Sequence, residues 1–248
     1  MLQKRIIIWI KVLFNYFSSF KKLKCIILDS ENTVGLQLET KKSLIRFGDG
    51  EFNLLNKKDV HYQKYSLELA AELKKILLEY SIESNYIIAV PYYYFSNNNT
   101  VLNNRLLISC WSIPKTIFKK NMQKNVPYGD AFLFSKNNKK IKIFEKIWEN
   151  YTNIVFVHNN EIYTKAINLK KNQKLFYVKV PNKNAYEKIE NIQNDIEMTF
   201  ILNDLLKSNS IILISAGPAA KVLVYSLSKK GFLCIDTGHC WDDPLEVK

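Results

Sequence analysis

One stretch near the carboxyl end of this 248-residue sequence constrains the fold more than any other. Residues 211–215 form a continuous apolar run, which is typical of a central strand covered on both faces. Gly217-Pro218 then predicts the start of a helix over about 219–229, and a second apolar strand follows over 232–236. The order strand, helix, strand predicts two parallel strands joined by a crossover helix.

The same alternation of strand and helix runs through the rest of the chain. Apolar runs and helical spacing of apolar residues predict further strands over 43–47, 86–90, 131–134, 154–157 and 175–180, and helices over 66–80, 141–148 and 184–206. We therefore expect residues 25–248 to form a single α/β, Rossmann-like domain with a mainly parallel sheet and helices on both faces.

Residues 1–24 predict an amphipathic N-terminal helix ahead of that domain. Its apolar stretch is shorter than the roughly 20 residues that a spanning helix needs. Polar side chains recur along one stripe, at Lys4, Lys11, Asn15, Ser18 and Lys22. This pattern fits a helix lying in a membrane interface, or one packed on its own domain or on a second subunit. We expect a cytoplasmic protein, with the inner face of the cytoplasmic membrane as its place if the helix binds lipid.

Composition narrows the possible functions. Net charge is +13, from 36 basic and 23 acidic residues, so the surface should attract phosphates in nucleotides, lipids or nucleic acids. The alternative is a solvated, lysine-rich surface without a specific partner. The four cysteines form no Cys-x-x-Cys pair and only three histidines occur, which argues against a zinc site and a disulfide framework.

The strand over 43–47 ends in Gly48-Asp49-Gly50-Glu51, a turn that delivers two carboxylates to the tip of a strand. Mg²⁺ and Mn²⁺ prefer oxygen ligands, and proteins commonly hold them with one or two carboxylates plus substrate phosphates. Asp49 and Glu51 are therefore candidate metal ligands, although a capped turn with a solvated glutamate has the same sequence. Arg46 favours a site, because a buried arginine needs a carboxylate or phosphate partner.

Two further groups of polar residues follow predicted strands and should lie at the same sheet edge. Residues 217–221 combine a helix N-terminus with Lys221, which suits a phosphate. The segment contains neither a P-loop nor a dinucleotide-binding glycine motif, and a simple turn remains the alternative. The second group is acidic and includes one histidine: His239, Asp242, Asp243 and Glu246. We interpret His61 and His158 as ordinary structural histidines.

At this point the motifs match a known family. Residues 46–51, Arg-Phe-Gly-Asp-Gly-Glu, resemble the N-terminal signature of the bacterial GT-D glycosyltransferases, a family long catalogued as a domain of unknown function. Residues 217–223, 230–232 and 235–239 resemble its C-terminal signature, and 181–186 resemble a weaker third block. The blocks occur in the family's order and span most of the chain.

The resemblance implies a nucleotide-sugar donor, commonly a UDP-sugar, and a divalent metal, usually Mn²⁺ or else Mg²⁺. Asp49 and Glu51 would form the metal and diphosphate centre. The resemblance also implies residues beside the donor: Arg46, Gly48, Asn184, Gly217, Pro218, Ala219 and Lys221. His239 would be a further site residue, and Asp243 or Glu246 would act as the catalytic base.

The chain departs from the family pattern after Gly238-His239, where the usual acidic run is replaced by Cys-Trp-Asp-Asp-Pro-Leu-Glu. Asp243 keeps the place of one family carboxylate, whereas Glu246 is displaced by one residue from another. The segment 158–171 is also shorter than usual. The predicted function is metal-dependent transfer of a sugar to a glycan acceptor, carried on a lipid diphosphate or a glycoprotein, in surface polysaccharide or glycoconjugate assembly.

Two other classes of protein stay open at this stage. A basic nucleic-acid-binding protein would gather its basic residues with aromatics on one face, whereas the lysines here are scattered and no nucleic-acid module is recognisable, so we expect no nucleic-acid partner. A catalytically silent relative that binds a nucleotide-sugar and scaffolds another enzyme is supported only by the altered acidic run.

Overall fold

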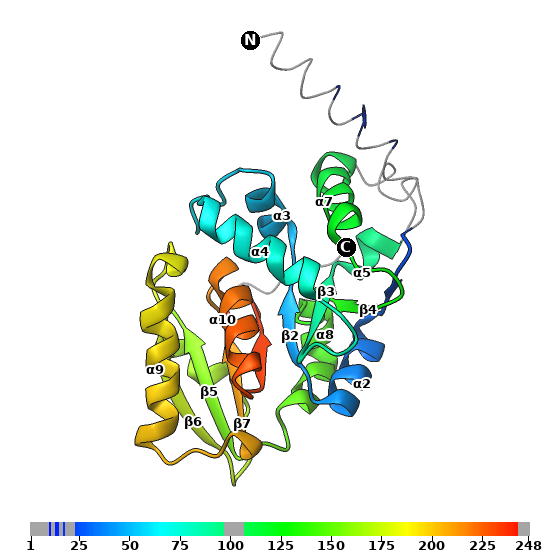
Figure 1. Cartoon of the computed structure of the whole chain (residues 1–248). Helices are drawn as coiled ribbons and strands as arrows, with labels where there is room; N and C mark the ends of the chain where they lie inside the picture. The colour runs from blue at the N-terminus through cyan, green and yellow to red at the C-terminus, as the bar shows by residue number, and fades with distance from the viewer. Residues whose placement is uncertain (1–9, 11–12, 15–16, 18–22, 97–106, 243–248) are drawn as a thin grey trace.

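The computed structural model describes residues 10, 13–14, 17, 23–96 and 107–242. It contains an eight-stranded sheet in which every neighbouring pair of strands is parallel, in the order β1-β4-β3-β2-β8-β7-β5-β6 (Figure 1). The strands are β1 (Ile26–Ile27), β2 (Ser43–Arg46), β3 (Tyr86–Val90), β4 (Pro127–Asp130), β5 (Asn153–His158), β6 (Lys174–Lys179), β7 (Ser210–Ile214) and β8 (Cys234–Asp236).

Helices cover both faces of this sheet, as predicted. One face carries α3 (Asp49–Leu55), α4 (Leu67–Glu79), α5 (Tyr92–Ser96), α7 (Ile108–Asn121), α9 (Ile189–Leu202) and α10 (Pro218–Lys229). The other face carries α2 (Ser30–Thr40), α8 (Lys136–Ile141) and the 3₁₀ turn η1 (Ile143–Ile147). Short 3₁₀ turns complete the connections: η2 (Glu161–Ala166), η3 (Ala185–Lys188) and η4 (Lys207–Asn209).

The apolar strand runs make this three-layer arrangement possible. Successive side chains of a strand point to opposite faces, so a run that is apolar throughout feeds two cores. In β2, Leu44 packs under α2 and Ile45 packs under the α4 and α10 layer; in β7, Ile211 and Ile212 divide in the same way. All four are fully buried.

The carboxyl ends of β5 and β7 meet at a switch in topology. From β5 the chain passes through η2 to β6, toward one edge of the sheet, whereas from β7 it passes through α10 to β8, toward the other edge (Figure 1). β5 and β7 are direct neighbours. In open parallel sheets, ligands bind beyond the carboxyl ends of the strands at such a point.

Several predicted boundaries were wrong. The strand expected over 131–134 is a turn, because the true strand β4 ends at Asp130, whose carboxylate accepts the backbone N–H of Phe132. The helix expected over 141–148 is mostly the 3₁₀ turn η1, and the one expected over 184–206 divides into η3 and α9. Lys142 and Asn184, which both have positive φ, directly precede η1 and η3.

The N-terminal residues that the structure describes form one apolar helical face. Ile10, Leu13, Phe14 and Phe17 are helical, have the i, i+3, i+4, i+7 spacing, and are all exposed. Within the described residues, no helix has both the length and the apolar character needed to cross a bilayer. The division into a 1–24 helix and a 25–248 domain stays a prediction.

Candidate active site

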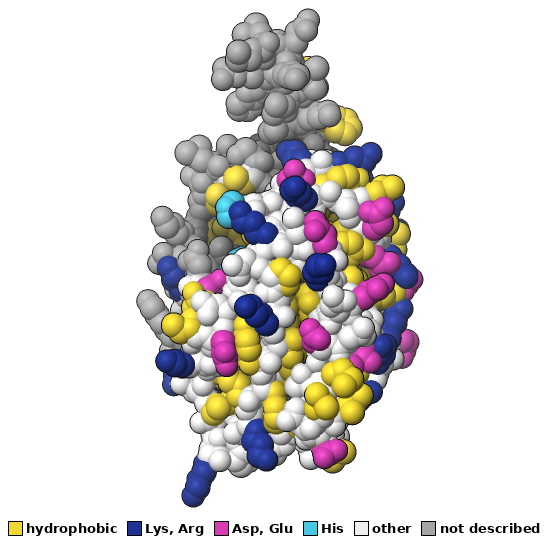
Figure 2. All heavy atoms as spheres, turned by 90° about the vertical axis from the view of Figure 1, so that its left-hand side faces the viewer, with side chains coloured by type: hydrophobic (Ala, Val, Ile, Leu, Met, Phe, Trp, Pro, Cys, Tyr) yellow, Lys and Arg dark blue, Asp and Glu magenta, His cyan; other side chains and the backbone are white. Residues whose placement is uncertain are grey.

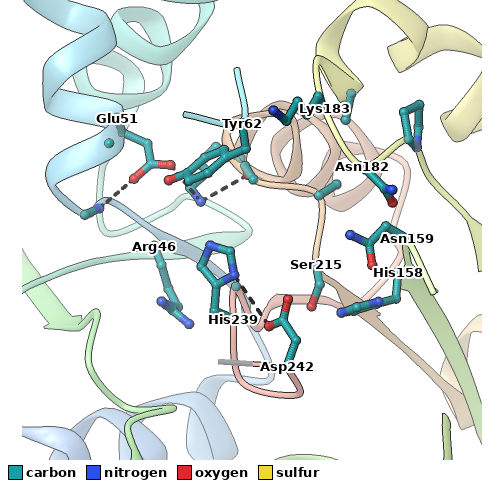
Figure 3. A pocket seen from close by; sticks show the side chains of 18 of the residues that line it. Arg46, Glu51, Tyr62, His158, Asn159, Asn182, Lys183, Ser215, His239 and Asp242 are labelled. Carbon is teal, nitrogen blue, oxygen red and sulfur yellow. Dashed lines mark hydrogen bonds and ion pairs between the residues drawn. The ribbon is translucent and has the colours of Figure 1, made fainter. Parts of the chain in front are cut away.

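A cavity of about 370 Å³ opens at the carboxyl edge of the sheet. Its walls come from the segments that follow five strands, together with Tyr62 from the loop between α3 and α4 (Figure 3). The strands concerned are β2, β5, β6, β7 and β8. The three groups of polar residues that we expected at this edge, 48–51, 217–221 and the group that begins at His239, therefore all contribute to the same cavity.

The motif that follows β2, residues 48–51, continues directly into helix α3. We predicted a turn at Gly48-Asp49-Gly50-Glu51, but α3 begins at Asp49 with Gly48 as its N-cap. The Glu51 carboxylate accepts the Gly48 backbone N–H at 2.7 Å, which satisfies one of the unpaired N–H groups of the helix start. Acidic residues are also favoured in a first helical turn, so the motif serves both the helix and the site.

Lys221 lies at the centre of the site. Its ammonium is 3.0 Å from Glu51 Oε1, 3.0 Å from Asp236 Oδ2 and 3.2 Å from the Gly217 carbonyl oxygen. These three oxygens take all three ammonium hydrogens. Burial lowers the pKa of Lys221, but the Asp236 and Glu51 carboxylates outweigh it and raise that pKa overall. Lys221 is 5% exposed, so its charge is held within the protein interior.

Arg46 lies beside this cluster, and its backbone N–H donates to Asp236 Oδ2 at 3.1 Å, whereas its guanidinium contacts a backbone carbonyl. Its Nη1 donates to the Thr237 carbonyl at 2.7 Å, and its guanidinium stacks 5.2 Å from the Phe134 ring centre. Gly238 has φ +52°, and a Cβ there would lie 3.0 Å from the guanidinium nitrogens. Glycine is therefore needed at position 238 for the arginine to lie flat against the backbone.

The charges of the buried cluster balance without Asp49. Lys221 and Arg46 supply two positive charges, and Glu51 and Asp236 supply two negative ones. Asp49 lines the cavity as an additional carboxylate. Asp49 is an exposed residue, and partial desolvation, followed by the neighbouring Glu51 charge, raises its pKa above the usual range. A cation at this point would relieve that repulsion.

The two carboxylates of the motif fit a divalent cation only together with ligands from a substrate. Within the described part of the chain each Glu51 oxygen has one partner, and a carboxylate offers about four lone-pair positions, so Glu51 can accept a further ligand contact. Asp49 faces the cavity. The described residues include no group of three or more histidine, cysteine or acidic side chains that could hold a metal. Phosphate oxygens would complete the shell, which is how Mg²⁺ and Mn²⁺ are commonly held.

Tyr62 covers the cavity above two motif glycines. A Cβ on Gly50 would lie 2.7 Å from the Tyr62 hydroxyl, and one on Gly217, which has φ +56°, would lie 3.1 Å from its ring. Tyr62 also makes an edge contact with His239, with ring centres 5.6 Å apart. Asn184 fastens this loop, since its N–H donates to the Tyr62 carbonyl and its side chain accepts the Lys64 N–H.

The structure brings most of the predicted site residues together. Those lining the cavity are Arg46, Gly48, Asp49, Glu51, Gly217, Lys221 and His239. Pro218 and Ala219 are buried in the first turn of α10, and Asn184 acts on the cavity through the Tyr62 loop. Asp243 and Glu246 lie outside the described residues, whereas Asp242 lines the cavity with its Oδ1 3.5 Å from His239 Nδ1.

Sequence reasoning missed three residues of the site. Asp236 could have been found, because a carboxylate at the end of an apolar strand needs a buried cation, and Lys221 was available. His158 was interpreted as structural, but it lines the cavity at the end of β5. No sequence signal points to Tyr62, which the chain brings in from a loop.

Comparison with known proteins defines the class. The sequence matches the family profile described as "Glycosyltransferase GT-D fold" over residues 44–244. A solved structure described as domain of unknown function 1792, with a distinct glycosyltransferase fold, superimposes with a TM-score of 0.70 at 25% identity over 91% of this chain and 83% of its own. The chain belongs to the GT-D fold family of glycosyltransferases, as its motifs predicted.

Among curated proteins, glycosyltransferase GlyD of Streptococcus pneumoniae serotype 4 is 25% identical over 234 residues, covering 84% of this chain and 26% of GlyD. The probable glycosyl transferase Gly of Streptococcus gordonii is 25% identical over 236 residues, covering 86% of this chain and 32% of Gly. The chain thus spans about a quarter to a third of these relatives. A solved glycosyltransferase from Streptococcus sanguinis shares the fold, with a TM-score of 0.70 at 24% identity over 88% of this chain and 82% of its own.

Proposed function

We propose that this protein transfers a sugar from a nucleotide-sugar, with UDP as the nucleotide, to a glycan acceptor. The observation that carries the proposal is the meeting of Asp49, the Arg46 guanidinium and the N-terminus of α10 around one cavity. A helix N-terminus and a guanidinium both favour a diphosphate, and an unbalanced carboxylate beside them favours a divalent cation.

Several residues of the site act on the leaving diphosphate, each in a different way. The positive N-terminal end of α10 and the Arg46 guanidinium orient the diphosphate and stabilise its growing charge. Pro218 has no N–H and the Ala220 N–H donates to the Gly217 carbonyl, so the helix acts here mainly through its dipole. Lys221 acts indirectly, since its three protein contacts hold Glu51 and Asp236 in place. Asp49, with Glu51, would hold Mn²⁺ or Mg²⁺, which when bound supplies Lewis-acid neutralisation of the leaving diphosphate.

The acceptor side of the proposal rests on the segment after β8. An inverting transfer needs a base beside the acceptor hydroxyl, and the candidates are His239 and the acidic residues that follow it. His239 is exposed at the cavity, and Asp242 lies beside its Nδ1. Asp243 and Glu246 stay candidates from the sequence alone.

A direct test is a thermal-shift screen of nucleotide-sugars with and without Mn²⁺, followed by detection of nucleoside diphosphate release. We expect one UDP-sugar to stabilise the protein in Mn²⁺ and to be turned over with an added glycan acceptor. Asp49→Ala should abolish the part of this stabilisation and turnover that depends on Mn²⁺. Metal-dependent turnover that survives Asp49→Ala together with Glu51→Ala would refute the metal assignment. Binding without turnover under any condition would favour the silent scaffold.

We also propose that the exposed apolar face formed by Ile10, Leu13, Phe14 and Phe17 contacts a membrane surface. Lysines and an arginine flank this face in the sequence at positions 4, 5, 21, 22 and 24, which suits anionic headgroups. A lipid-diphosphate-linked acceptor would be reached from that position. By contrast, Figure 2 shows basic side chains interspersed with acidic ones on the α9 side, which does not favour a nucleic-acid groove there.

Vesicle sedimentation tests the membrane contact. The triple variant Leu13→Ser, Phe14→Ser, Phe17→Ser should lose binding to vesicles that contain phosphatidylglycerol. The double variant Ile201→Ser, Leu202→Ser is the matched control, because it removes equally exposed apolar side chains from the far end of α9. Equal loss in both variants, or no binding by the unaltered protein, would contradict the proposal.

A further inference from the structure

The side of the cavity away from Glu51 and Arg46 has a polar wall that the donor chemistry above does not use. Figure 3 shows His158, Asn159, Ser215 and Asp242 gathered there. His158 ends β5, and Ser215 directly follows the neighbouring strand β7. Ser215 is two residues before Gly217, so this wall adjoins the N-terminus of α10.

The imidazole of His158 is fixed in one orientation and one tautomer. Its Nδ1 accepts the Asn160 backbone N–H at 3.1 Å, its ring stacks on Phe156 with centres 5.3 Å apart, and Tyr163 packs at 4.9 Å. Because Nδ1 is an acceptor, the hydrogen of the neutral ring is on Nε2. Burial lowers the pKa of His158, which keeps the ring neutral near pH 7.

The Nε2–H group has no hydrogen-bond acceptor within the described part of the chain, although His158 is only 2% exposed. Since the residue lines the cavity, this donor is available to a ligand there. The Nε2 atom is accessible from the cavity, so a ligand oxygen there would replace water as its acceptor.

The hydroxyl of Ser215 is held in place by its neighbour Thr237. Thr237 Oγ1 lies 2.8 Å from Ser215 Oγ, 3.3 Å from the Ile214 carbonyl oxygen and 3.0 Å from Trp241 Nε1. The Ile214 carbonyl also accepts the Thr237 backbone N–H at 2.9 Å, so either hydroxyl can be the donor of the 2.8 Å bond. In both arrangements Ser215 keeps at least one lone pair for the cavity.

We propose that His158 and Ser215 form a hydroxyl-recognition subsite for the hexose of the donor. A sugar hydroxyl is both a donor and an acceptor, and this wall offers the His158 N–H beside a Ser215 hydroxyl that keeps a lone pair. The inference rests on the proposed function, and it makes His158 and Ser215 specificity-determining residues. Because the subsite adjoins Gly217, a sugar bound there lies next to its own diphosphate. Asp242 and Asn159 add polar groups for neighbouring hydroxyls.

Calorimetry on the full chain in Mn²⁺ tests this subsite with UDP, UDP-glucose, UDP-galactose and UDP-N-acetylglucosamine as probes. His158→Phe keeps a flat ring but removes the N–H, and Ser215→Ala removes the acceptor. Each variant should weaken binding of the preferred UDP-hexose about 10- to 100-fold, the usual effect of an unpaired buried polar group. Each should leave the affinity for UDP within about twofold of that of the unaltered protein. His158→Gln, whose amide nitrogen can replace Nε2, should recover most of the loss.

Tyr177→Phe is the matched control, because among the described residues the Tyr177 hydroxyl bonds only the His158 carbonyl, at 2.9 Å, and Tyr177 does not line the cavity. Tyr177→Phe should leave the affinities for UDP and for the preferred UDP-hexose unchanged. Equal weakening of UDP and UDP-hexose by His158→Phe and Ser215→Ala, or no weakening of either, would overturn the subsite while the proposed donor stands. If the unaltered protein binds none of the four probes, both the donor assignment and the subsite fail.

Discussion

Lys221 of α10 and Glu51 of α3 form a buried ion pair, with 3.0 Å between Nζ and Oε1. The pair joins the N-terminal and C-terminal motifs of the chain. Because Asp236 of β8 shares the same ammonium at 3.0 Å, the contact ties two helix starts and a strand end into one unit. The cavity of the active site is built on this unit.

Lys221→Met should destabilise the protein strongly. The change leaves the Glu51 and Asp236 carboxylates buried without a cation, and breaking a buried pair in this way typically costs about 3–5 kcal/mol. The free energy of unfolding in urea measures the loss.

The triple variant that adds Glu51→Gln and Asp236→Asn provides the control. Removing both charges should recover a large part of the lost stability, because the cost lies in the uncompensated carboxylates and not in the missing lysine stem. A triple variant as unstable as Lys221→Met alone would show that packing, not charge, explains the effect.

The effect of Gly50→Ala on the stability of the protein should reverse in sign when Tyr62 is replaced by phenylalanine. In the unaltered protein the added methyl meets the Tyr62 hydroxyl at 2.7 Å, and such overpacking costs about 1–3 kcal/mol. In a Tyr62→Phe background the nearest atoms are ordinary contacts at 3.7 and 3.8 Å, and alanine then gains up to about 1 kcal/mol from its helix propensity. Thermal unfolding of the four proteins tests this; a penalty of equal size in both backgrounds would contradict the placement of Tyr62.

The contrast between Gly50 and Tyr62 shows what the sequence could predict. Apolar strands, the parallel sheet and the carboxyl-edge residues depend on local patterns, so Asp49, Glu51, Gly217 and His239 could be placed in advance. The loop that brings Tyr62 over Gly50 depends on contacts between distant segments, which periodicity does not encode. The true end of β4 was missed for the same reason, because it depends on the buried carboxylate of Asp130.

His158 should make stability depend on pH in mildly acidic solution. Burial, opposed by Asp242, lowers the pKa of His158 in the folded protein below its ordinary value of 6.5. As pH falls through 6.5, the unfolded chain binds a proton that the folded protein resists, so the free energy of unfolding falls. The decline, at most about 1.4 kcal/mol per pH unit for one proton, continues until the folded pKa is reached.

The matched comparison is His158→Gln, which does not titrate. The difference in free energy of unfolding between the unaltered protein and this variant should be constant above pH 6.5 and shift against the unaltered protein below it. Parallel curves from pH 7.5 to pH 5 would show that His158 titrates normally.

Arg46→Lys should reduce nucleotide binding while leaving the fold largely intact. A lysine keeps the charge but cannot lie flat against Gly238 and Phe134 while donating to the Thr237 carbonyl. We expect UDP affinity to fall about tenfold, the loss of one charge-assisted hydrogen bond. Fluorescence-detected UDP titration measures this, and unchanged affinity would place Arg46 outside the diphosphate contacts.

The most direct test of the central claim is calorimetric titration of UDP into the unaltered protein and into Asp49→Asn, each in Mn²⁺ and in EDTA. The arrangement of Asp49, Arg46 and the α10 N-terminus predicts binding to the unaltered protein in Mn²⁺, and at least tenfold weaker binding in EDTA and in Asp49→Asn. Absence of UDP binding in every condition, or Mn²⁺-dependent affinity that is the same in Asp49→Asn, would contradict it.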